Sequence, residues 1–142
     1  LLIDQKQIYR WRWQQWRAAA KAGAVNRWYT TCQFPLGWLR YCQPQRWRGA
    51  KTSNLGLWKT DFERVNGFDE QYEGWGYEDS DLVIRLLNAG VKHKQGRFAA
   101  PVMHLWHQEQ TRDNAAINWD SLQKTRAQKQ VRAQKGLKEH CI

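Results

Sequence analysis

The chain has 142 residues, 42% of them hydrophobic, and a formal net charge of +10. This length is typical of one domain or a fragment and excludes two large domains. The apolar share suffices for a core, and no apolar run approaches the roughly 18 residues that cross a bilayer. Ten tryptophans indicate either an aromatic core or a ligand surface.

The first half of the chain is predicted to contain two helices. Residues 6–22 lack Gly and Pro and place apolar side chains on one side of a helical wheel, which predicts an amphipathic helix that ends at Gly23. Residues 27–48 are expected to be irregular. Residues 49–57 suit a short strand. A short helix follows over residues 59–65, with Thr60 as N-cap and Asn66-Gly67 as the stop.

The second half contains the clearest helix of the sequence, over residues 78–90, where apolar side chains recur at three- and four-residue steps until Gly90. Residues 91–94 and 99–105 are expected to be extended. A second basic helix is predicted over residues 114–136.

Positive charge is concentrated at the two ends of the chain. Residues 6–48 contain nine basic side chains and no acidic one, and residues 124–138 contain six and no acidic one. Residues 61–81 contain eight acidic side chains and one basic side chain, that of Arg64. A nucleic-acid module would interleave cations with aromatics on one face, so we expect no nucleic-acid partner. The alternative is a basic, aromatic-rich module that binds nucleic acid or an anionic membrane without catalysis.

Three cysteines, Cys32, Cys42 and Cys141, include no Cys-x-x-Cys pair. This spacing argues against a structural zinc site and favours reduced thiols, with a Cys32–Cys42 disulfide as the alternative. We expect a cytoplasmic location, with peripheral contact at the inner face of the membrane, because Trp-rich basic helices bind anionic interfaces.

The residue types that recognise sugars are concentrated in residues 74–81. Two glycines flank Trp75, which allows a tight turn that displays the indole ring, and Glu78 and Asp79 follow. A pyranose offers an apolar face to an aromatic ring and hydroxyls to carboxylates. A carboxylate here could also accept a proton from an attacking hydroxyl. The same acids would equally suit the first turn of a structural helix, where the helix dipole favours them.

Metal ligands are indicated less clearly. His104 and His107 stand three residues apart with Glu109 behind them, and they suit either a divalent-metal ligand or a half-buried strand. The residues alone favour the half-buried strand over the metal ligand. Asp79 and Asp81 form an Asp-x-Asp pattern, but helical residues two apart do not face the same ion.

Four motifs in this order resemble one known family. They are residues 48–54, 62–70, 74–79 and 104–107. Together they resemble the galactosyltransferase-like C-terminal module of family 2 nucleotide-sugar glycosyltransferases. The resemblance covers about residues 46–109, between a Trp-rich basic segment over residues 1–45 and a basic helical segment over residues 110–142.

This resemblance implies an α/β domain, the C-terminal portion of a GT-A fold with a small sheet and flanking helices. It implies inverting transfer of a sugar from a nucleotide-diphosphate donor, a UDP-sugar, to a glycan acceptor, with Mn²⁺ or Mg²⁺. Asp79 matches the catalytic base, and the partition of roles with Glu78 stays open. His104 and His107 both fit the metal-ligand position. We expect further substrate contacts from four residues, Asn54, Trp75, Gly76 and Asp81.

The sequence departs from the family before residue 46, where no strand with a phosphate-binding turn is recognisable. We therefore expect a fragment that lacks the nucleotide-binding half and is inactive alone. We expect it to bind a divalent cation weakly. We also expect it to form a homo-oligomer that shields the apolar face that the missing half would cover. A bacterial surface glycan is the expected acceptor, and the donor sugar stays open.

Overall fold

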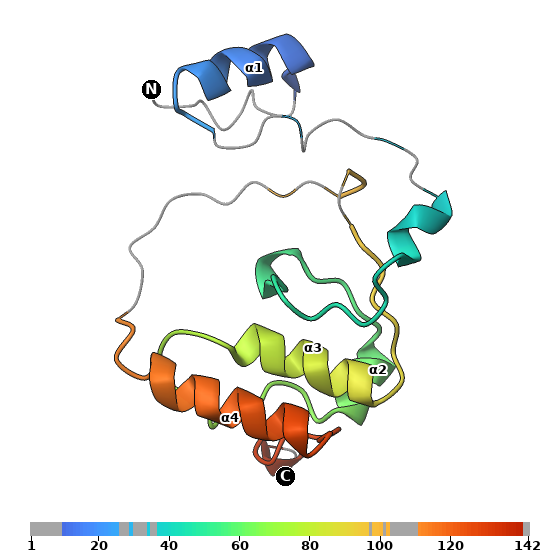
Figure 1. The fold of residues 1–142 in the computed structure, drawn as a ribbon, viewed down its shortest axis with the longest axis vertical. Coiled ribbons are helices and arrows are strands. Elements are labelled where there is room, and N and C mark those ends of the chain that lie inside the picture. Colours follow the sequence, from blue (N-terminus) through green and yellow to red (C-terminus); the bar gives the residue numbers. More distant parts are fainter. Residues whose placement is uncertain are drawn as a thin grey trace. The chain divides into compact units, whose positions relative to one another are not determined.

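A computed structural model describes residues 10–25, 29, 34, 37–96, 98–100, 102 and 111–140. The contacts divide the chain into two compact units (Figure 1). One unit comprises Leu1–Cys42 and Gln95–Met103, and the other comprises Gln43–Lys94 and His104–Ile142. Each unit is described by itself.

The described helices of the first unit are α1 (Trp13–Lys21) and the 3-10 helix η3 (Gly37–Tyr41). The Arg12 backbone N–H donates to the Gln15 side chain at 2.6 Å and so fixes the start of α1. The helix predicted over residues 6–22 is confirmed over Trp13–Lys21. Residues 6–9 lie outside the described part of the chain.

The described helices of the second unit are η4 (Thr52–Asn54), α2 (Lys59–Arg64), α3 (Glu78–Asn88), α4 (Ala115–Ala127) and η5 (Leu137–His140). Their core consists of Leu82, Leu86 and Ala89 from the apolar face of α3, together with Val65 from the end of α2. This confirms the helix predicted from the spacing of its apolar residues. It stops before Gly90, whose φ of 89° favours glycine.

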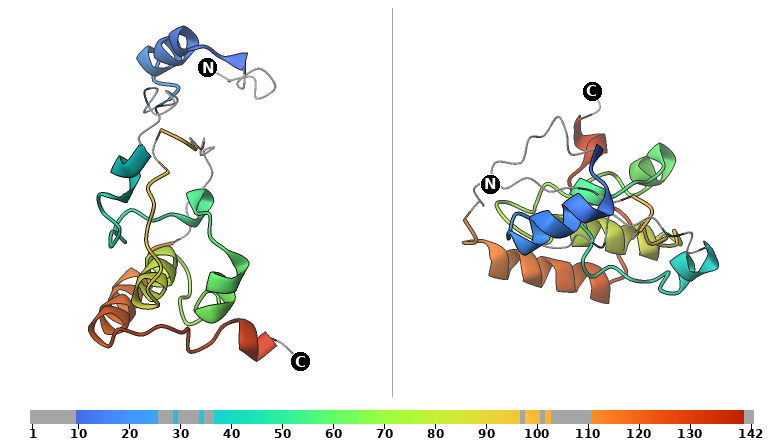
Figure 2. Two further views of the ribbon diagram at one scale, coloured as in Figure 1. Left: turned by 90° about the vertical axis from the view of Figure 1, so that its right-hand side faces the viewer. Right: turned by 90° about the horizontal axis from the view of Figure 1, so that it is seen from above.

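α3 and α4 lie side by side and run in the same direction (Figure 1, Figure 2). At their starts, the Asn118 amide of α4 donates to the Glu73 carbonyl, shortly before α3 begins. At their far ends, the Asn88 amide of α3 donates to the Gln130 carbonyl just beyond α4. Both N-termini therefore lie at the same end of this unit.

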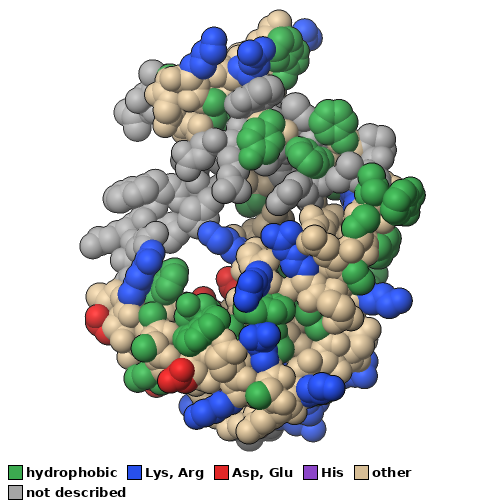
Figure 3. Space-filling model, viewed as in Figure 1, with side chains coloured by type: hydrophobic (Ala, Val, Ile, Leu, Met, Phe, Trp, Pro, Cys, Tyr) green, Lys and Arg blue, Asp and Glu red, His purple; other side chains and the backbone are tan. Residues whose placement is uncertain are grey.

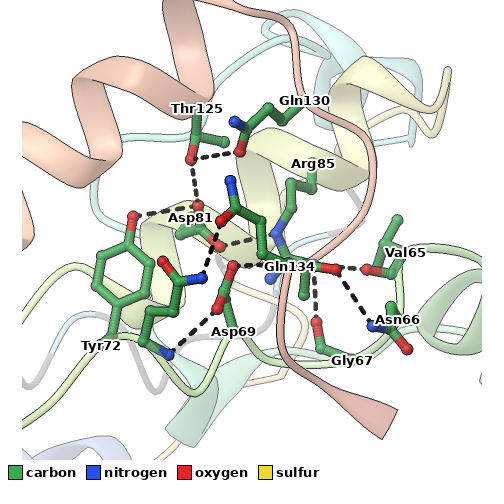
Figure 4. A network of polar contacts seen from close by, with 12 residues as sticks. Val65, Asn66, Gly67, Asp69, Tyr72, Asp81, Arg85, Thr125, Gln130 and Gln134 are labelled. Carbon is green, nitrogen blue, oxygen red and sulfur yellow. Dashed lines mark hydrogen bonds and ion pairs between the residues drawn. The ribbon is translucent and has the colours of Figure 1, made fainter. Parts of the chain in front are cut away.

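A buried ion pair joins α3 to both of its neighbours (Figure 4). Asp81 and Arg85 are at most 1% exposed, and Arg85 Nε donates to Asp81 Oδ2 at 2.7 Å. Arg85 Nη1 also donates to the carbonyls of Val65 (2.7 Å) and Gly67 (2.8 Å), just beyond α2. The Thr125 hydroxyl of α4 donates to Asp81 Oδ1 at 2.8 Å. The pair thus fixes α2, α3 and α4 together.

The Tyr72 phenol completes this network by donating to Asp81 Oδ1 at 3.2 Å. Burial, followed by the nearby Asp81 carboxylate, raises the pKa of Tyr72 well above its ordinary value. The phenol therefore remains a hydrogen-bond donor across the physiological pH range.

The chain after α4 folds back onto the turn that follows α2. Asn66 there adopts a left-handed conformation with φ of 65°, and its carbonyl accepts a hydrogen bond from the Leu137 N–H at 3.1 Å. A Cβ on Gly136 would lie 2.0 Å from the Asn66 carbonyl oxygen, so a larger residue would force this segment away. Because the segment turns back, the helix predicted over residues 114–136 is confirmed only over Ala115–Ala127.

The prediction of a small sheet is wrong for the described part of the chain, which contains helices and no strand. Residues 49–57, expected to be a strand, instead contain η4. Residues 91–94 are extended, but the bond from the His93 N–H to the Pro44 carbonyl does not belong to the ladder that defines a strand pair. The α/β fold class with a small GT-A sheet is therefore wrong for the residues described.

Two local expectations also change. α2 begins at Lys59 after Trp58, so Thr60 lies inside the helix and is not its N-cap. Cys42 is an exposed free thiol, as expected, and the Cys32–Cys42 disulfide is therefore wrong. None of the described helices combines the length and the apolar character needed to span a membrane.

The buried pair predicts a large stability effect. In Asp81→Asn, Arg85 keeps its charge in a buried site without a counterion, and we expect the free energy of unfolding to fall by about 3–5 kcal/mol. Urea denaturation of the 142-residue chain measures this. The matched control is Glu63→Gln, which removes a carboxylate from the exposed Lys59–Glu63 pair (3.6 Å) and should cost less than about 1 kcal/mol. Equal losses of unfolding free energy in the two variants would contradict the structural role of Asp81.

Candidate functional site

The loop before α3 has an unusual backbone conformation. Gly74, Gly76 and Tyr77 all have positive φ, at 74°, 109° and 75°. The glycines adopt such angles easily, but in Tyr77 the left-handed conformation costs about 1 kcal/mol. The Tyr77 carbonyl nevertheless accepts the first hydrogen bond of α3, from the Asp81 N–H at 2.9 Å. Strain of this kind persists only where the surroundings hold it in place.

The start of α4 holds this loop in place. The Asn118 side chain is 3% exposed, and its amide donates to the carbonyls of Glu73 (3.1 Å) and Trp75 (3.4 Å). The Trp119 ring packs against the Tyr77 ring with 5.1 Å between centroids. Aromatic pairs of this kind contribute about 0.5–1.5 kcal/mol, which offsets part of the strain at Tyr77.

The acid pair predicted as catalytic occupies the first two positions of α3. Glu78 and Asp79 are both half-buried. Glu78 Oε2 and Asp79 Oδ1 are inaccessible to solvent and have no hydrogen-bond partner among the described residues. Buried polar atoms are nearly always paired in folded proteins, so these two oxygens require an explanation. A ligand with hydroxyl groups would supply the missing donors.

Trp75 precedes the acid pair in the sequence and is 37% exposed, as a sugar-binding ring would be. The Arg112 guanidinium lies over this ring, with its central carbon 4.2 Å from the ring centroid. Arg112 itself is exposed to solvent. The site therefore contains a cation stacked on its aromatic ring, in addition to the two carboxylates.

The structure places the other predicted substrate contacts differently. Gly76 is buried within the loop, and Asn54 is exposed at the end of η4. Asp81 belongs to the buried network, where both of its oxygens accept hydrogen bonds from within the protein. We therefore assign Asp81 a structural role.

His104 and His107, the predicted metal ligands, lie outside the described residues. Within the described part of the chain, no three His, Cys, Asp or Glu side chains are grouped so that they could hold a metal ion. Glu78 and Asp79 alone are too few donors for a divalent cation.

A separate apolar cleft of about 390 Å³ lies between η4, α2 and α3. Its lining includes Leu55, Trp58, Phe62 and Phe68, but neither Trp75 nor the acid pair. It is therefore distinct from the loop and the acid pair.

Sequence reasoning missed the residues of α4 and of the segment before it. Asn118 and Arg112 lie outside all four motifs, and no local pattern connects them to the Trp75 loop. For Tyr77 the sequence does give one indication of an unusual role, because this residue lies between Gly76 and the acids, at the boundary of the predicted helix.

Comparisons with known proteins support the resemblance drawn from the motifs. Residues 41–108 match a family model described as the N-terminal domain of galactosyltransferase. The resemblance to galactosyltransferases is therefore confirmed over this range, which includes α2, the Trp75 loop and α3. The place of this segment within a longer enzyme stays a prediction.

Two relatives illustrate the extent of the similarity. A validoxylamine A glucosyltransferase from Streptomyces hygroscopicus subsp. jinggangensis is 47% identical over 45 residues, which cover 32% of this chain and 11% of the relative. Beta-1,4-galactosyltransferase 2 from Homo sapiens is 49% identical over 37 residues, which cover 26% of this chain and 10% of the relative. The matching stretch thus spans about a tenth of these relatives. No solved structure matches the chain.

The loop geometry predicts that Asn118 determines the position of Trp75. Asn118→Ala removes the amide bond to the Trp75 carbonyl and leaves the Glu73 carbonyl with the Asn114 amide at 3.2 Å, and we expect the free energy of unfolding to fall by about 1–3 kcal/mol. The Trp75 indole N–H resonance should shift at the same time. Asn88→Ala is the control, because it removes a comparable amide bond, to the Gln130 carbonyl at 2.7 Å, at the far end of α3. An unchanged Trp75 resonance in Asn118→Ala would show that α4 does not position the loop.

Proposed function

We propose that this chain carries the catalytic base and a sugar-binding surface of an inverting glycosyltransferase. Such an enzyme moves a sugar from a nucleotide-diphosphate donor to a glycan. The observation that carries this proposal is a pair of buried oxygens, Glu78 Oε2 and Asp79 Oδ1, that have no partner in the described part of the chain and that follow the exposed Trp75 by three and four residues. The match of residues 41–108 to galactosyltransferases supports it.

In the proposed reaction, the Asp79 carboxylate accepts the proton of an acceptor hydroxyl. The acceptor oxygen forms a bond to the anomeric carbon of the donor sugar, and the bond from that carbon to the phosphate oxygen breaks. The nucleoside diphosphate leaves with the electron pair. Successive helical residues are about 100° apart, so Glu78 takes a different position, from which it would bind a sugar hydroxyl.

Trp75 would contact the apolar face of a sugar while the acid pair binds its hydroxyls. The glycines on either side allow the tight turn that displays the ring, and we propose that the buried Gly76 contributes to the site through its backbone. Asn54, exposed on η4, remains proposed as a further substrate contact.

A UDP-sugar donor and a divalent cation, Mn²⁺ or Mg²⁺, are further parts of the proposal. The relatives named as glucosyltransferase and galactosyltransferase support a hexose donor. His104 or His107 would contribute one metal ligand. The described residues do not by themselves fit a cation, and we therefore derive no reaction step through one.

We also propose that the chain is the part of a longer transferase that lacks its nucleotide-binding half and is inactive alone. A cytoplasmic location, peripheral contact with the membrane and self-association complete this proposal, with a bacterial surface glycan as acceptor. The exposed rings of Trp38 (75%) and Trp58 (79%) support surface contacts of this kind. So do the basic side chains spread over the face drawn in Figure 3.

The function is tested by replacing the base in the full-length enzyme that we propose contains this segment. We expect Asp79→Asn to lower kcat by at least about 100-fold, the loss typical of removing a general base. Sugar transfer from radiolabelled UDP-galactose and UDP-glucose measures this. The control is Asp113→Asn, which removes an exposed carboxylate and should leave turnover unchanged.

Glu78→Gln serves as the second variant in this experiment. Full turnover in Asp79→Asn with loss in Glu78→Gln would move the base to Glu78. Full turnover in both variants would contradict the proposed function.

The metal proposal makes a prediction for the 142-residue chain. One imidazole and a carboxylate pair supply too few ligands, so we expect calorimetry to show no Mn²⁺ binding in the micromolar range. His104→Ala and His107→Ala should then leave the titration unchanged. Micromolar Mn²⁺ affinity that either variant abolishes would show that the chain holds a complete metal site.

A further inference from the structure

Among the described residues, Arg112 is the cation that lies over the ring of the candidate sugar site. Its central carbon lies 4.2 Å from the Trp75 ring centroid. The other described arginine–tryptophan pairs are wider, with 5.6 Å between Arg17 and Trp13 and with 5.3 Å and 5.1 Å from Arg48 and Arg126 to Trp47. A sugar that reaches both Trp75 and the acid pair therefore lies within reach of this guanidinium.

The position of Arg112 affects neutral and acidic sugars in opposite ways. A neutral pyranose that stacks on the covered face of Trp75 would displace the guanidinium and lose the cation–π contact. A sugar with a carboxylate can leave the guanidinium on the ring and accept hydrogen bonds from it. Guanidinium has five N–H donors in a planar fork that matches a carboxylate, and such charge-assisted bonds are stronger than neutral ones.

The charges around the site also fix the orientation of such a ligand. Glu78 and Asp79 repel a carboxylate and accept hydroxyl protons, whereas Arg112 attracts a carboxylate. A hexuronic acid has this arrangement, because its carboxylate is on C5 and its hydroxyls are on C2 to C4. The nearest acid along the chain is Asp113, the exposed neighbour of Arg112, and the first turn of α4 that follows it contains no acidic residue.

We propose that Arg112 is a specificity-determining residue and that the sugar bound between Trp75 and the acid pair carries a carboxylate, as a hexuronic acid does. This inference rests on the proposed function, because it names the substrate class of the same site. Arg112 selects the ligand, and the proton transfer stays with the acid pair.

The experiment uses the ¹⁵N-labelled 142-residue chain and observes the Trp75 indole N–H, assigned with Trp75→Phe. Methyl β-D-glucuronide and methyl β-D-glucoside form a matched pair that differs only at C6. We expect the glucuronide to shift this resonance at about tenfold lower concentration. In Arg112→Gln the two dissociation constants should come within about twofold of each other. Added salt should weaken the preference in the unchanged chain.

Arg126→Gln is the matched control, since it removes an arginine that also stacks on a tryptophan. From residue 112 to residue 126, α4 and its flanks extend about 20 Å at 1.5 Å per residue, so Arg126 lies well away from the Trp75 loop. We expect this variant to keep the full preference for the glucuronide. An equal loss of the preference for the glucuronide in both variants would show that this preference depends on net charge and not on Arg112, and would overturn the inference.

Inorganic pyrophosphate is the third probe, because the diphosphate of a nucleotide-sugar donor could also meet the guanidinium. Tighter binding of pyrophosphate than of glucuronide, with the same dependence on Arg112, would assign this residue to the donor and overturn the acidic-sugar inference. Equal binding of the two glycosides, or binding of neither, would overturn it as well. Failure of the proposed function is distinguishable, because it appears as retained turnover in Asp79→Asn and Glu78→Gln, which this titration does not measure.

Discussion

The arrangement of the second unit depends on the buried ion pair between Asp81 and Arg85. The two side chains together bind the turn after α2, the body of α3 and the middle of α4. Buried ion pairs add little net stability compared with apolar packing, because desolvating two charges is costly. Their effect here is geometric. Arg85 Nη1 reaches the Val65 and Gly67 carbonyls only if α2 and α3 meet at this position, and Asp81 accepts from Thr125 only if α4 lies against α3.

That geometry creates the candidate site. Parallel packing brings the start of α4 to the start of α3, where Asn118 and Trp119 hold the Trp75 loop in its strained conformation. The loop in turn places an exposed ring before two carboxylates, each with one buried oxygen that lacks a partner in the part of the chain that the structure describes. An unpaired buried oxygen and a strained residue are both unfavourable in the absence of a ligand. Their occurrence within two residues of each other is the physical reason to regard this end of the unit as functional.

The family match and the site overlap only in part. Residues 41–108 contain the Trp75 loop and the acid pair, whereas Arg112, Asn118 and Thr125 lie beyond the match. The matched segment thus supplies the groups proposed for chemistry. The segment beyond it supplies the contacts that orient the loop and the cation that covers the ring. Substrate preference can therefore differ among proteins that share the motif.

The sequence alone determined the helices α2 and α3 and the juxtaposition of Trp75 with Glu78 and Asp79, because helical periodicity and a loop of five residues are local properties. It did not determine the absence of strands from the described chain, since an extended segment becomes a strand only when a partner supplies its hydrogen bonds. Nor could it separate Asp81 from Asp79. Both are acids in one helical turn, and the packing of α4 and Arg85 around Asp81 makes that residue structural, whereas Asp79 Oδ1 has no partner among the described residues.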